Sequence, residues 1–169
     1  RNCFEIGTFD GRTALNMAAN SGTEGQIYTL DLPKTKLGDT GLEIEKDDVY
    51  YIAKDSSGDR FQTTPYKHKI QQLYGDSATF DFSPYAGKMD FVFVDGAHSY
   101  DYVLNDSRKA IQLLRDQKGI ILWHDDNQKS GVTDCLNKLY QQEAAFRDLR
   151  HIEGTALVCL ICGKDNLSV

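Results

Sequence analysis

Short apolar runs that end at a glycine or an aspartate recur along the chain and predict buried parallel β-strands. They lie at 3–6, 26–31, 70–74, 91–94 and 120–123. Because the carboxyl ends of parallel strands meet at one edge of a sheet, the polar residues that end these runs are expected to gather there. That edge is where open α/β folds bind ligands and carry out chemistry.

Apolar residues at helical spacing follow several of these strands and predict helices between them. The first helix begins after Gly11, the second runs from Tyr100 to Leu114, and the third begins near Ser130, whose hydroxyl is expected to cap it. The alternation of strand and helix predicts an α/β fold that opens with a βαβ unit.

The tail of the chain predicts a different strand pairing. Residues 149–153 and 155–162 have the pattern of two strands joined at Gly154, in a turn too short for a parallel crossover, so they should pair antiparallel. Cys159 and Cys162 lie in the second of these strands, where residues three apart point to opposite faces. We therefore expect buried thiols there rather than a redox or zinc motif.

Residues 33–69 interrupt the alternation of strands and helices. The segment is polar, is broken by glycines and by Ser56-Ser57-Gly58, and predicts a short helix within 45–54. We expect an insertion or cover beside the site, within a single domain that spans 1–169. Because the strand pattern begins at Asn2 with no helix before it, an amino-terminal segment is expected to be missing.

Composition narrows the classes of partner. The chain has 169 residues, 40% of them hydrophobic, which is enough for one core, and a net charge of −6. No run of Lys and Arg offers the positive charge that nucleic acid requires, so a small-molecule partner is favoured. The chain shows neither a membrane-spanning run nor a secretory signal, so a cytoplasmic location without a membrane partner is predicted. The sequence leaves open whether the chain forms a homo-oligomer.

The segment E-I-G-T-F-D-G at 5–11 combines a strand end, a glycine turn and a helix start. Gly7 allows a sharp turn and the close approach of a ligand, and the helix presents free N–H groups. The spacing is Gly-x-x-x-Gly, so the dinucleotide signature G-x-G-x-x-G is absent. Asp31 lies about twenty positions further on, where a carboxylate can accept both ribose hydroxyls. The alternatives are a structural turn and, for Asp31, a turn or cap before Pro33.

Gly75, Asp76 and Ser77 follow the run at 70–74, where a small residue and a hydrogen-bonding side chain could receive an adenine. Taken alone, this tripeptide is an ordinary turn. Its position at the same sheet edge favours a role in binding.

Asp95, Asp125 and Asp126 follow two strands that should be neighbours. Three converging carboxylates repel one another unless a cation or raised pKa values relieve them. Mg²⁺ fits such oxygen ligands and keeps positions open for a substrate oxygen. The alternative is that Asp126 caps a turn or faces solvent.

His98 lies three residues beyond Asp95, over the same edge. An imidazole there can take a proton from a substrate hydroxyl, because its ordinary pKa is close to neutral pH. Two alternatives remain open: His98 or His124 ligates a metal such as Fe or Zn, or His124 forms a hydrogen bond beneath the site.

Together these motifs resemble the class I S-adenosylmethionine-dependent methyltransferases, in order and over nearly the whole chain. The motifs are E-I-G-T-F-D-G at 5–11, L-D-L at 30–32, Y-G-D-S at 74–77, V-D-G-A-H-S-Y at 94–100 and W-H-D-D-N at 123–127. The resemblance is closest to the metal-dependent small-molecule O-methyltransferases of the catechol and macrolide-sugar types, and to the related bacterial D-G-x-H-S-Y group. It implies a three-layer Rossmann-like fold with a mostly parallel seven-stranded sheet whose last strand is antiparallel.

The resemblance also implies roles for individual residues. His98 would be the general base, and Asp95, Asp125 and Asp126 would hold Mg²⁺. The methionine part of S-adenosylmethionine would lie on the glycine turn, the ribose on Asp31 and the adenine beside Ser77. The full expected cofactor set is Gly7, Thr8, Phe9, Gly11, Asp31, Leu32, Gly75, Asp76, Ser77 and Asp95.

The expected reaction is therefore methyl transfer from S-adenosylmethionine to a small-molecule hydroxyl, assisted by a divalent metal. Other enzymes on the same scaffold remain as alternatives, namely an NAD-dependent dehydrogenase or a metal-dependent oxygenase. A third alternative is a cofactor-binding or assembly domain without turnover.

Overall fold

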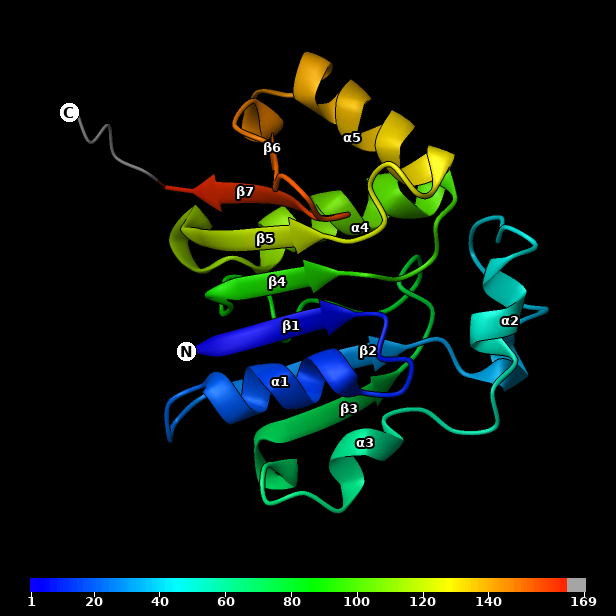
Figure 1. The fold of residues 1–169 in the computed structure, drawn as a ribbon, viewed down its shortest axis with the longest axis vertical. Coiled ribbons are helices and arrows are strands. Elements are labelled where there is room, and N and C mark those ends of the chain that lie inside the picture. Colours follow the sequence, from blue (N-terminus) through cyan, green and yellow to red (C-terminus); the bar gives the residue numbers. More distant parts are fainter. Residues whose placement is uncertain (164–169) are drawn as a thin grey trace.

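Seven strands form the central sheet of the computed structural model, which describes residues 1–163 (Figure 1). Their order across the sheet is β3-β2-β1-β4-β5-β7-β6. The strands are β1 (Asn2–Ile6), β2 (Gln26–Asp31), β3 (Ile70–Tyr74), β4 (Phe91–Val94), β5 (Gly119–Trp123), β6 (Arg150–His151) and β7 (Val158–Cys162). Strand β7 pairs antiparallel with β5 and β6, and the other pairings are parallel. The predicted seven-stranded sheet with an antiparallel last strand is confirmed.

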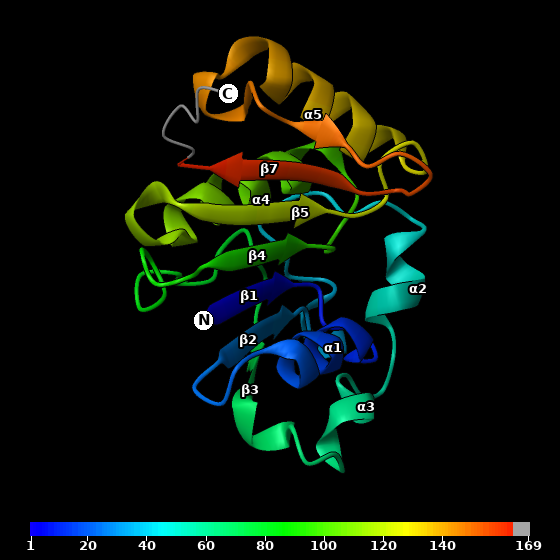
Figure 2. The ribbon, with the colours of Figure 1, turned by 60° about the vertical axis from the view of Figure 1, so that its left-hand side comes forward.

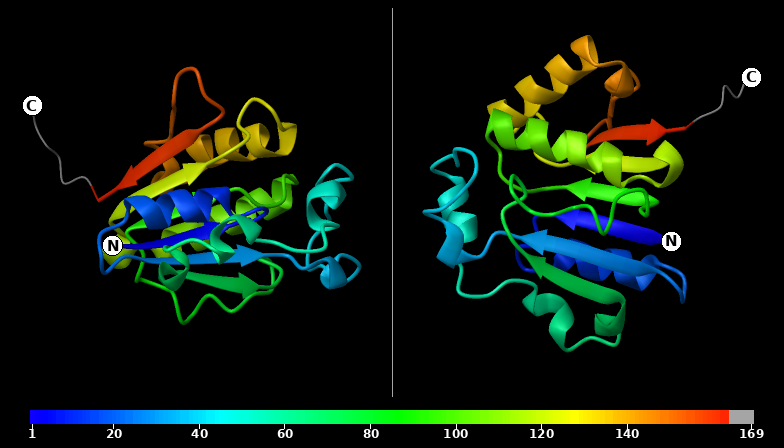
Figure 3. Two further views of the ribbon diagram at one scale, coloured as in Figure 1. Left: turned by 60° about the horizontal axis from the view of Figure 1, so that its bottom comes forward. Right: turned by 180° about the vertical axis from the view of Figure 1, so that it is seen from behind.

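Helices cover the two faces of the sheet and give the three layers (Figures 2 and 3). The helices are α1 (Arg12–Asn20), α2 (Asp48–Ile52), α3 (Asp59–Gln62), α4 (Tyr100–Leu113) and α5 (Ser130–Gln142), with short 3₁₀ turns η1 (Lys34–Lys36), η2 (Lys67–Lys69), η3 (Arg115–Gln117) and η4 (Ala144–Phe146). Helix α1 lies on one face, and α4 and α5 lie together on the other. No helix in the described part of the chain is long and apolar enough to cross a membrane.

The larger core lies between the sheet and the helices α4 and α5 that cover one of its faces. In the central strands Phe4, Val92 and Ile121 are paired side by side, and none of the three exposes any surface. Side chains alternate between the faces of a strand, so the next row, which contains Glu5 and Phe93, faces the side of α1. Strands buried on both faces explain the nearly continuous apolar runs in the sequence.

The insertion at 33–69 has two structurally different parts. Phe61 on α3 is fully buried and packs with Ala14, Ala18, Ile27 and Ile70 in a second, smaller core under α1. Helix α2, by contrast, stands beyond the carboxyl ends of the strands (Figure 1). The α2 part therefore borders the edge at which the site was expected, and Asp48, Tyr51 and Ile52 of α2 line a cavity there.

The expected cap of the last long helix is wrong. Ser130 is the first residue of α5, and the residue before it, Lys129, makes no side-chain cap. Thr133 instead accepts a hydrogen bond from the backbone N–H of Asn127 at 2.8 Å and donates one to Asp126 at 2.9 Å. The turn before α5 is thus held by a hydroxyl from inside the helix. No disulfide joins the cysteines in the described part of the chain. Cys159 and Cys162, which were expected to be buried, are half-buried instead.

Asp106 on α4 is a buried carboxyl group whose ionisation opposes folding. Its Oδ1 accepts a hydrogen bond from Asn105 at 2.8 Å, whereas its Oδ2 has no partner among the described residues. Burial raises the pKa of Asp106 to about 7. Because this pKa is higher than in the unfolded chain, folding is favoured by the bound proton below it, and stability falls as the pH rises from about 4 to 7.

Asp106→Asn is therefore expected to stabilise the protein by about 1–3 kcal/mol at pH 8 and by much less at pH 5. Urea unfolding at the two pH values measures the difference. A stability change that is the same at both values would show that the Asp106 carboxyl is not protonated in the folded chain at pH 5.

Candidate active site

A cavity of about 310 Å³ opens at the carboxyl edge of the sheet, between the strand ends and α2. Its size is that of a small-molecule site. Its lining comprises Ile6, Gly7, Phe9, Leu30, Asp31, Leu32, Asp48, Tyr51, Ile52, Lys54, Gly75, Ser77, Asp95, Gly96, Ala97, His98, His124, Asp125, Gln128 and Lys129. The strand ends thus meet where the sequence predicted. Thr8, Gly11, Asp76 and Asp126, which were also expected at the site, do not line the cavity.

The turn after β1 is fixed by its neighbour, the turn after β4. Gly7 has a φ of +101°, and a Cβ atom there would lie 1.9 Å from the carbonyl oxygen of Asp95. Glycine is required because two backbones approach each other at this point. Gly11 instead directly precedes α1, packs against Phe61 and does not line the cavity.

Asp31 closes this turn from β2. Its Oδ1 accepts hydrogen bonds from the backbone N–H groups of Thr8 and Phe9, at 3.2 and 3.3 Å. Its Oδ2 forms an ion pair with Lys54 at 2.7 Å. Pro33 precedes η1 without any side-chain cap, so Asp31 is not a helix cap. The carboxylate is held rigidly at the cavity wall.

Beneath the turn lies a buried polar chain that the sequence did not reveal. Thr29 donates to Glu5 at 2.5 Å, and the hydroxyls of Thr8 and Thr29 lie 2.6 Å apart. Burial raises the pKa of Glu5 well above its usual range. Thr8 therefore supports the turn from below rather than facing the cavity.

The residues of the turn after β3 face in different directions. Gly75 and Ser77 line the cavity, as expected. The Asp76 carboxylate accepts hydrogen bonds from the backbone N–H of Gly41 at 2.7 Å and from the hydroxyl of Tyr102 at 2.8 Å. Asp76 thus ties the insertion to α4 instead of reaching the cavity.

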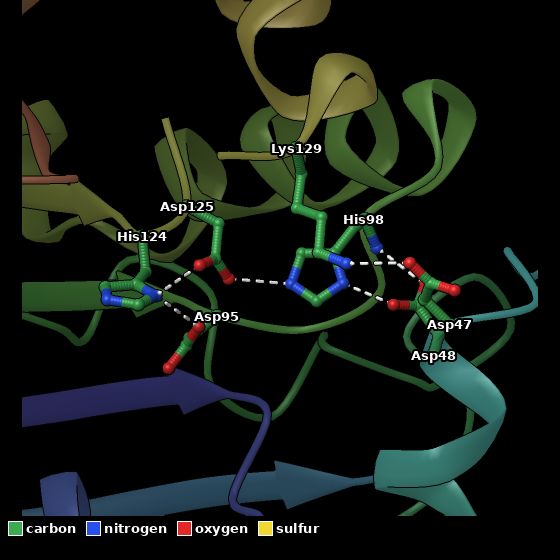
Figure 4. Close-up of polar contacts among 7 residues, drawn as sticks. All are labelled: Asp47, Asp48, Asp95, His98, His124, Asp125 and Lys129. Carbon is green, nitrogen blue, oxygen red and sulfur yellow. Dashed lines mark hydrogen bonds and ion pairs between the residues drawn. The ribbon is translucent and has the colours of Figure 1, made fainter. Parts of the chain in front are cut away.

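Asp95, His124 and Asp125 form a compact group of ligand-type atoms, all within 4.8 Å of one another (Figure 4). His124 Nδ1 lies 3.3 Å from Asp95 Oδ1 and 3.1 Å from Asp125 Oδ1. The hydrogen bond to Asp95 raises the pKa of His124 to about 9, and burial raises the pKa of Asp95. Two carboxylates and an imidazole at this spacing suit a divalent cation.

Asp126 does not join this group, although its neighbour in sequence does. Its Oδ1 accepts the Thr133 hydroxyl, and its Oδ2 lies 3.0 Å from His151 Nδ1. Asp125 has a φ of +64°, so the backbone turns between the two acids and sends their side chains apart. The expectation of three converging carboxylates thus differs from the structure, which brings in His124 as the third group.

His98 is held between two carboxylates, Asp125 and Asp48, which lie on opposite sides of its ring (Figure 4). Its Nε2 lies 2.7 Å from Asp125 Oδ2, and its Nδ1 contacts Asp48 Oδ1. Its backbone N–H also donates to Asp48 Oδ2 at 2.9 Å. Burial alone would lower the pKa of His98, but the hydrogen bonds to Asp125 and Asp48 raise it to about 9.

Several residues at the cavity were not found from the sequence. Asp48, Tyr51 and Lys54 come from the insertion, and Gln128 and Lys129 come from the turn before α5. The one available signal was the pair of adjacent acids, Asp47 and Asp48, in the segment that was expected to be helical.

Three solved structures with the same fold are distant from this chain in sequence. The O-methyltransferase NovP matches with a TM-score of 0.68 and 13% identity, over 95% of this chain and 71% of NovP. The O-methyltransferase TomG from Streptomyces achromogenes, solved in complex with SAM, gives 0.61 and 20%, over 96% and 74% of the two chains. The Podospora anserina methyltransferase PaMTH1, solved with SAH bound, gives 0.61 and 16%, over 96% and 72%. These matches confirm the fold.

A search of curated proteins gives no match. The profile of a family described as methyltransferase domain matches residues 4–125, which include the glycine turn, Asp31, His98 and the group at 124–125. The match covers well over half of the sequence. The chain therefore belongs to this family of methyltransferase domains.

Proposed function

We propose that the chain transfers a methyl group from S-adenosylmethionine to a hydroxyl oxygen of a small molecule, with the help of a divalent metal. The observation that carries the proposal is the convergence of His98 and of the Asp95, His124 and Asp125 group on the cavity that Asp31 lines. Two solved relatives of the same fold have SAM or SAH bound, which supports this choice of cofactor.

The polar groups and glycines at the strand ends support S-adenosylmethionine as the cofactor. Asp31 presents a buried carboxylate that can accept hydrogen bonds from ribose hydroxyls. The same carboxylate forms the ion pair with Lys54. Gly75 and Ser77 leave room and polar groups for an adenine on the neighbouring strand end. The turn after β1, with Gly7 and Phe9, would hold the methionine part. The expected cofactor residues Leu32 and Asp95 also line the cavity.

The donor set of Asp95, Asp125 and His124 fits a divalent ion. Such an ion, when bound, would lower the pKa of the acceptor hydroxyl. Mg²⁺ favours oxygen donors, so the imidazole of His124 also makes the site suitable for Mn²⁺, Fe²⁺ or Zn²⁺. Asp95 and Asp125 would hold Mg²⁺, with His124 nearby as a third group.

His98 would take the proton from the acceptor hydroxyl. Both ring nitrogens contact carboxylates, Nδ1 that of Asp48 and Nε2 that of Asp125, so the ring carries a proton on each nitrogen. If a bound metal drew Asp125 away, Nε2 would be the nitrogen able to act as a base, because Asp48 would still hold Nδ1. The hydrogen bond to Asp125 raises the pKa of His98, and Asp125 also belongs to the proposed metal ligands. A bound metal would compete for the Asp125 carboxylate and so lower the pKa of His98. The methyl donor is already activated, so the chain mainly positions the acceptor oxygen in line with it.

The cofactor part of the proposal is tested by ligand-induced thermal stabilisation. S-adenosylhomocysteine should raise the melting temperature, whereas NAD should not. Stabilisation by NAD alone would favour a dehydrogenase, and turnover that needs iron and 2-oxoglutarate would favour an oxygenase. Cofactor binding without any effect of metal or any turnover would point to a non-catalytic domain.

Asp31→Asn should weaken S-adenosylhomocysteine binding by about 10- to 100-fold, because a hydrogen bond to a charged group contributes roughly 1.5–3 kcal/mol. Isothermal titration measures the dissociation constant. Asp55→Asn is the control, since that carboxylate is exposed and pairs with Lys34 at 2.8 Å. Equal affinities for the two variants would mean that the ribose does not lie on Asp31.

A further inference from the structure

We infer that Asp48 is a positioning residue for methyl transfer, which acts by holding His98 through both its ring and its backbone. This inference rests on the proposed function and adds a residue to it. It also makes the insertion at 33–69 part of the active site, because α2 carries Asp48 to His98 (Figure 4).

The contact fixes His98 at two points. Asp48 Oδ1 meets the ring Nδ1, and Asp48 Oδ2 accepts the backbone N–H of His98 at 2.9 Å. A carboxylate anchored on the backbone cannot follow the imidazole if the ring rotates, so the pair defines one ring orientation. In that orientation Nδ1 carries a hydrogen towards Asp48, and Nε2 points to Asp125 at 2.7 Å. A carboxylate that orients a histidine in this way sets which nitrogen exchanges protons.

The burial of Asp48 gives this contact its weight. Asp48 exposes 2% of its surface, although it lies in a polar segment at the rim of a cavity. A buried carboxylate is costly unless it is paired. Both side-chain hydrogen bonds that the structure gives Asp48 go to His98. The placement of this charge is therefore explained by the histidine.

Anchoring of the insertion does not require Asp48. Lys54 on the same segment pairs with Asp31 at 2.7 Å, and the backbone of Gly41 donates to Asp76 at 2.7 Å. Ile52 on α2 is largely buried as well. With these contacts in place, loss of the Asp48 charge should release the ring of His98 more than it releases the segment.

The neighbouring acid provides a matched control. Asp47 lies one residue earlier and pairs with Lys129 at 3.3 Å, but its side chain is 77% exposed and makes no contact with His98 in the described structure. Asp47→Asn and Asp48→Asn therefore remove the same charge from the same turn. Only the second removes the hold on the ring.

The experiment compares the full chain with its Asp47→Asn and Asp48→Asn variants. Activity is followed as S-adenosylhomocysteine release at saturating S-adenosylmethionine and Mg²⁺, with the best acceptor from a panel of catechol, caffeate, protocatechuate and methyl glycosides. Asp48→Asn should lower kcat about 10- to 100-fold, part of the contribution of a general base. The KM for the acceptor, the affinity for S-adenosylhomocysteine and the melting temperature should change little. Asp47→Asn should match the parent in every measurement.

A histidine-ring NMR measurement reports the pairing without any need for turnover. Four histidines give few ring signals, so His98→Gln assigns that of His98. The His98 Nδ1–H proton should appear downfield in the parent and in Asp47→Asn, and should be lost from that position in Asp48→Asn. Its absence from the parent would overturn the inference even if Asp48→Asn failed to fold.

One kinetic and one equilibrium outcome would also overturn it. A kcat for Asp48→Asn within twofold of that for Asp47→Asn would show that the contact does not serve the reaction. Parallel losses of melting temperature and cofactor affinity would assign Asp48 to anchoring instead. If the parent neither binds S-adenosylhomocysteine nor turns over any acceptor, the proposed function itself fails, and the NMR signal still separates that failure from an error about the contact.

Discussion

Asp125→Asn should reduce methyl transfer by at least about 100-fold while leaving the affinity for S-adenosylhomocysteine within twofold. Asp125 is shared by the two parts of the proposed machinery, since its Oδ2 meets His98 at 2.7 Å and its Oδ1 meets His124 at 3.1 Å. Loss of its charge removes a metal ligand and one of the partners that orient the base, and either change costs orders of magnitude in rate. Initial rates at several Mg²⁺ and Mn²⁺ concentrations, with calorimetry for the cofactor, measure both quantities.

The adjacent residue gives the matched control for this prediction. Asp126→Asn removes the same charge one position later, where the carboxylate contacts Thr133 and His151 rather than the cavity. Its turnover and metal dependence should stay close to those of the parent. A folded Asp126→Asn protein as inactive as Asp125→Asn would restore Asp126 as a metal ligand and refute the assignment based on geometry.

Gly7→Ala should prevent the chain from folding stably, at a cost of more than about 4 kcal/mol. A Cβ at Gly7 would lie 1.9 Å from the carbonyl oxygen of Asp95, and the φ of +101° is itself unfavourable for alanine. The obstacle is backbone, so no side-chain rotation relieves it. The two strand ends would have to move apart, and the hydrogen bond from Asp95 N–H to the carbonyl of Ile6 joins them at 2.9 Å. Soluble yield and urea unfolding show the effect.

Gly22→Ala is the control for the strained position, because a Cβ at Gly22 meets nothing within 4 Å. Its stability should remain within about 1 kcal/mol of the parent. A Gly7→Ala protein that melts near the parent temperature and still binds S-adenosylhomocysteine would show that the turns after β1 and β4 are not in close contact.

The fold followed from the sequence because its central strands β1, β2 and β4 are largely buried on both faces. Each such strand is a nearly continuous apolar run, and its end is marked by the first residue that meets the cavity, as at Val94 and Asp95. The antiparallel tail was equally accessible, since the turn around Gly154 leaves no room for a crossover. These signals are local, so one sequence is enough to recognise them.

The parts of the site that escaped prediction depend on non-local contacts or on single backbone angles. Asp48 reaches His98 across 50 residues of sequence, from a polar segment without periodicity. The side chains of Asp125 and Asp126 diverge because φ is positive at Asp125. Aspartate can adopt a positive φ, but the sequence alone does not show where it does so. The same backbone turn explains why His124, and not Asp126, lies with Asp95 and Asp125. The residue types at the strand ends indicate which acids, bases and metal ligands are available. Only the three-dimensional structure shows which of these side chains meet at the cavity.

The division of the insertion limits how its sequence can vary. Phe61 has no exposed surface and fills the space beneath α1, so the stretch around α3 is as constrained as any strand. The preceding stretch includes the exposed side chains of Tyr50 and Tyr51, of which Tyr51 lies beside His98. Exposed positions on α2 such as Tyr50 can therefore vary more freely than Phe61 on α3, whereas Asp48 on α2 is held to His98.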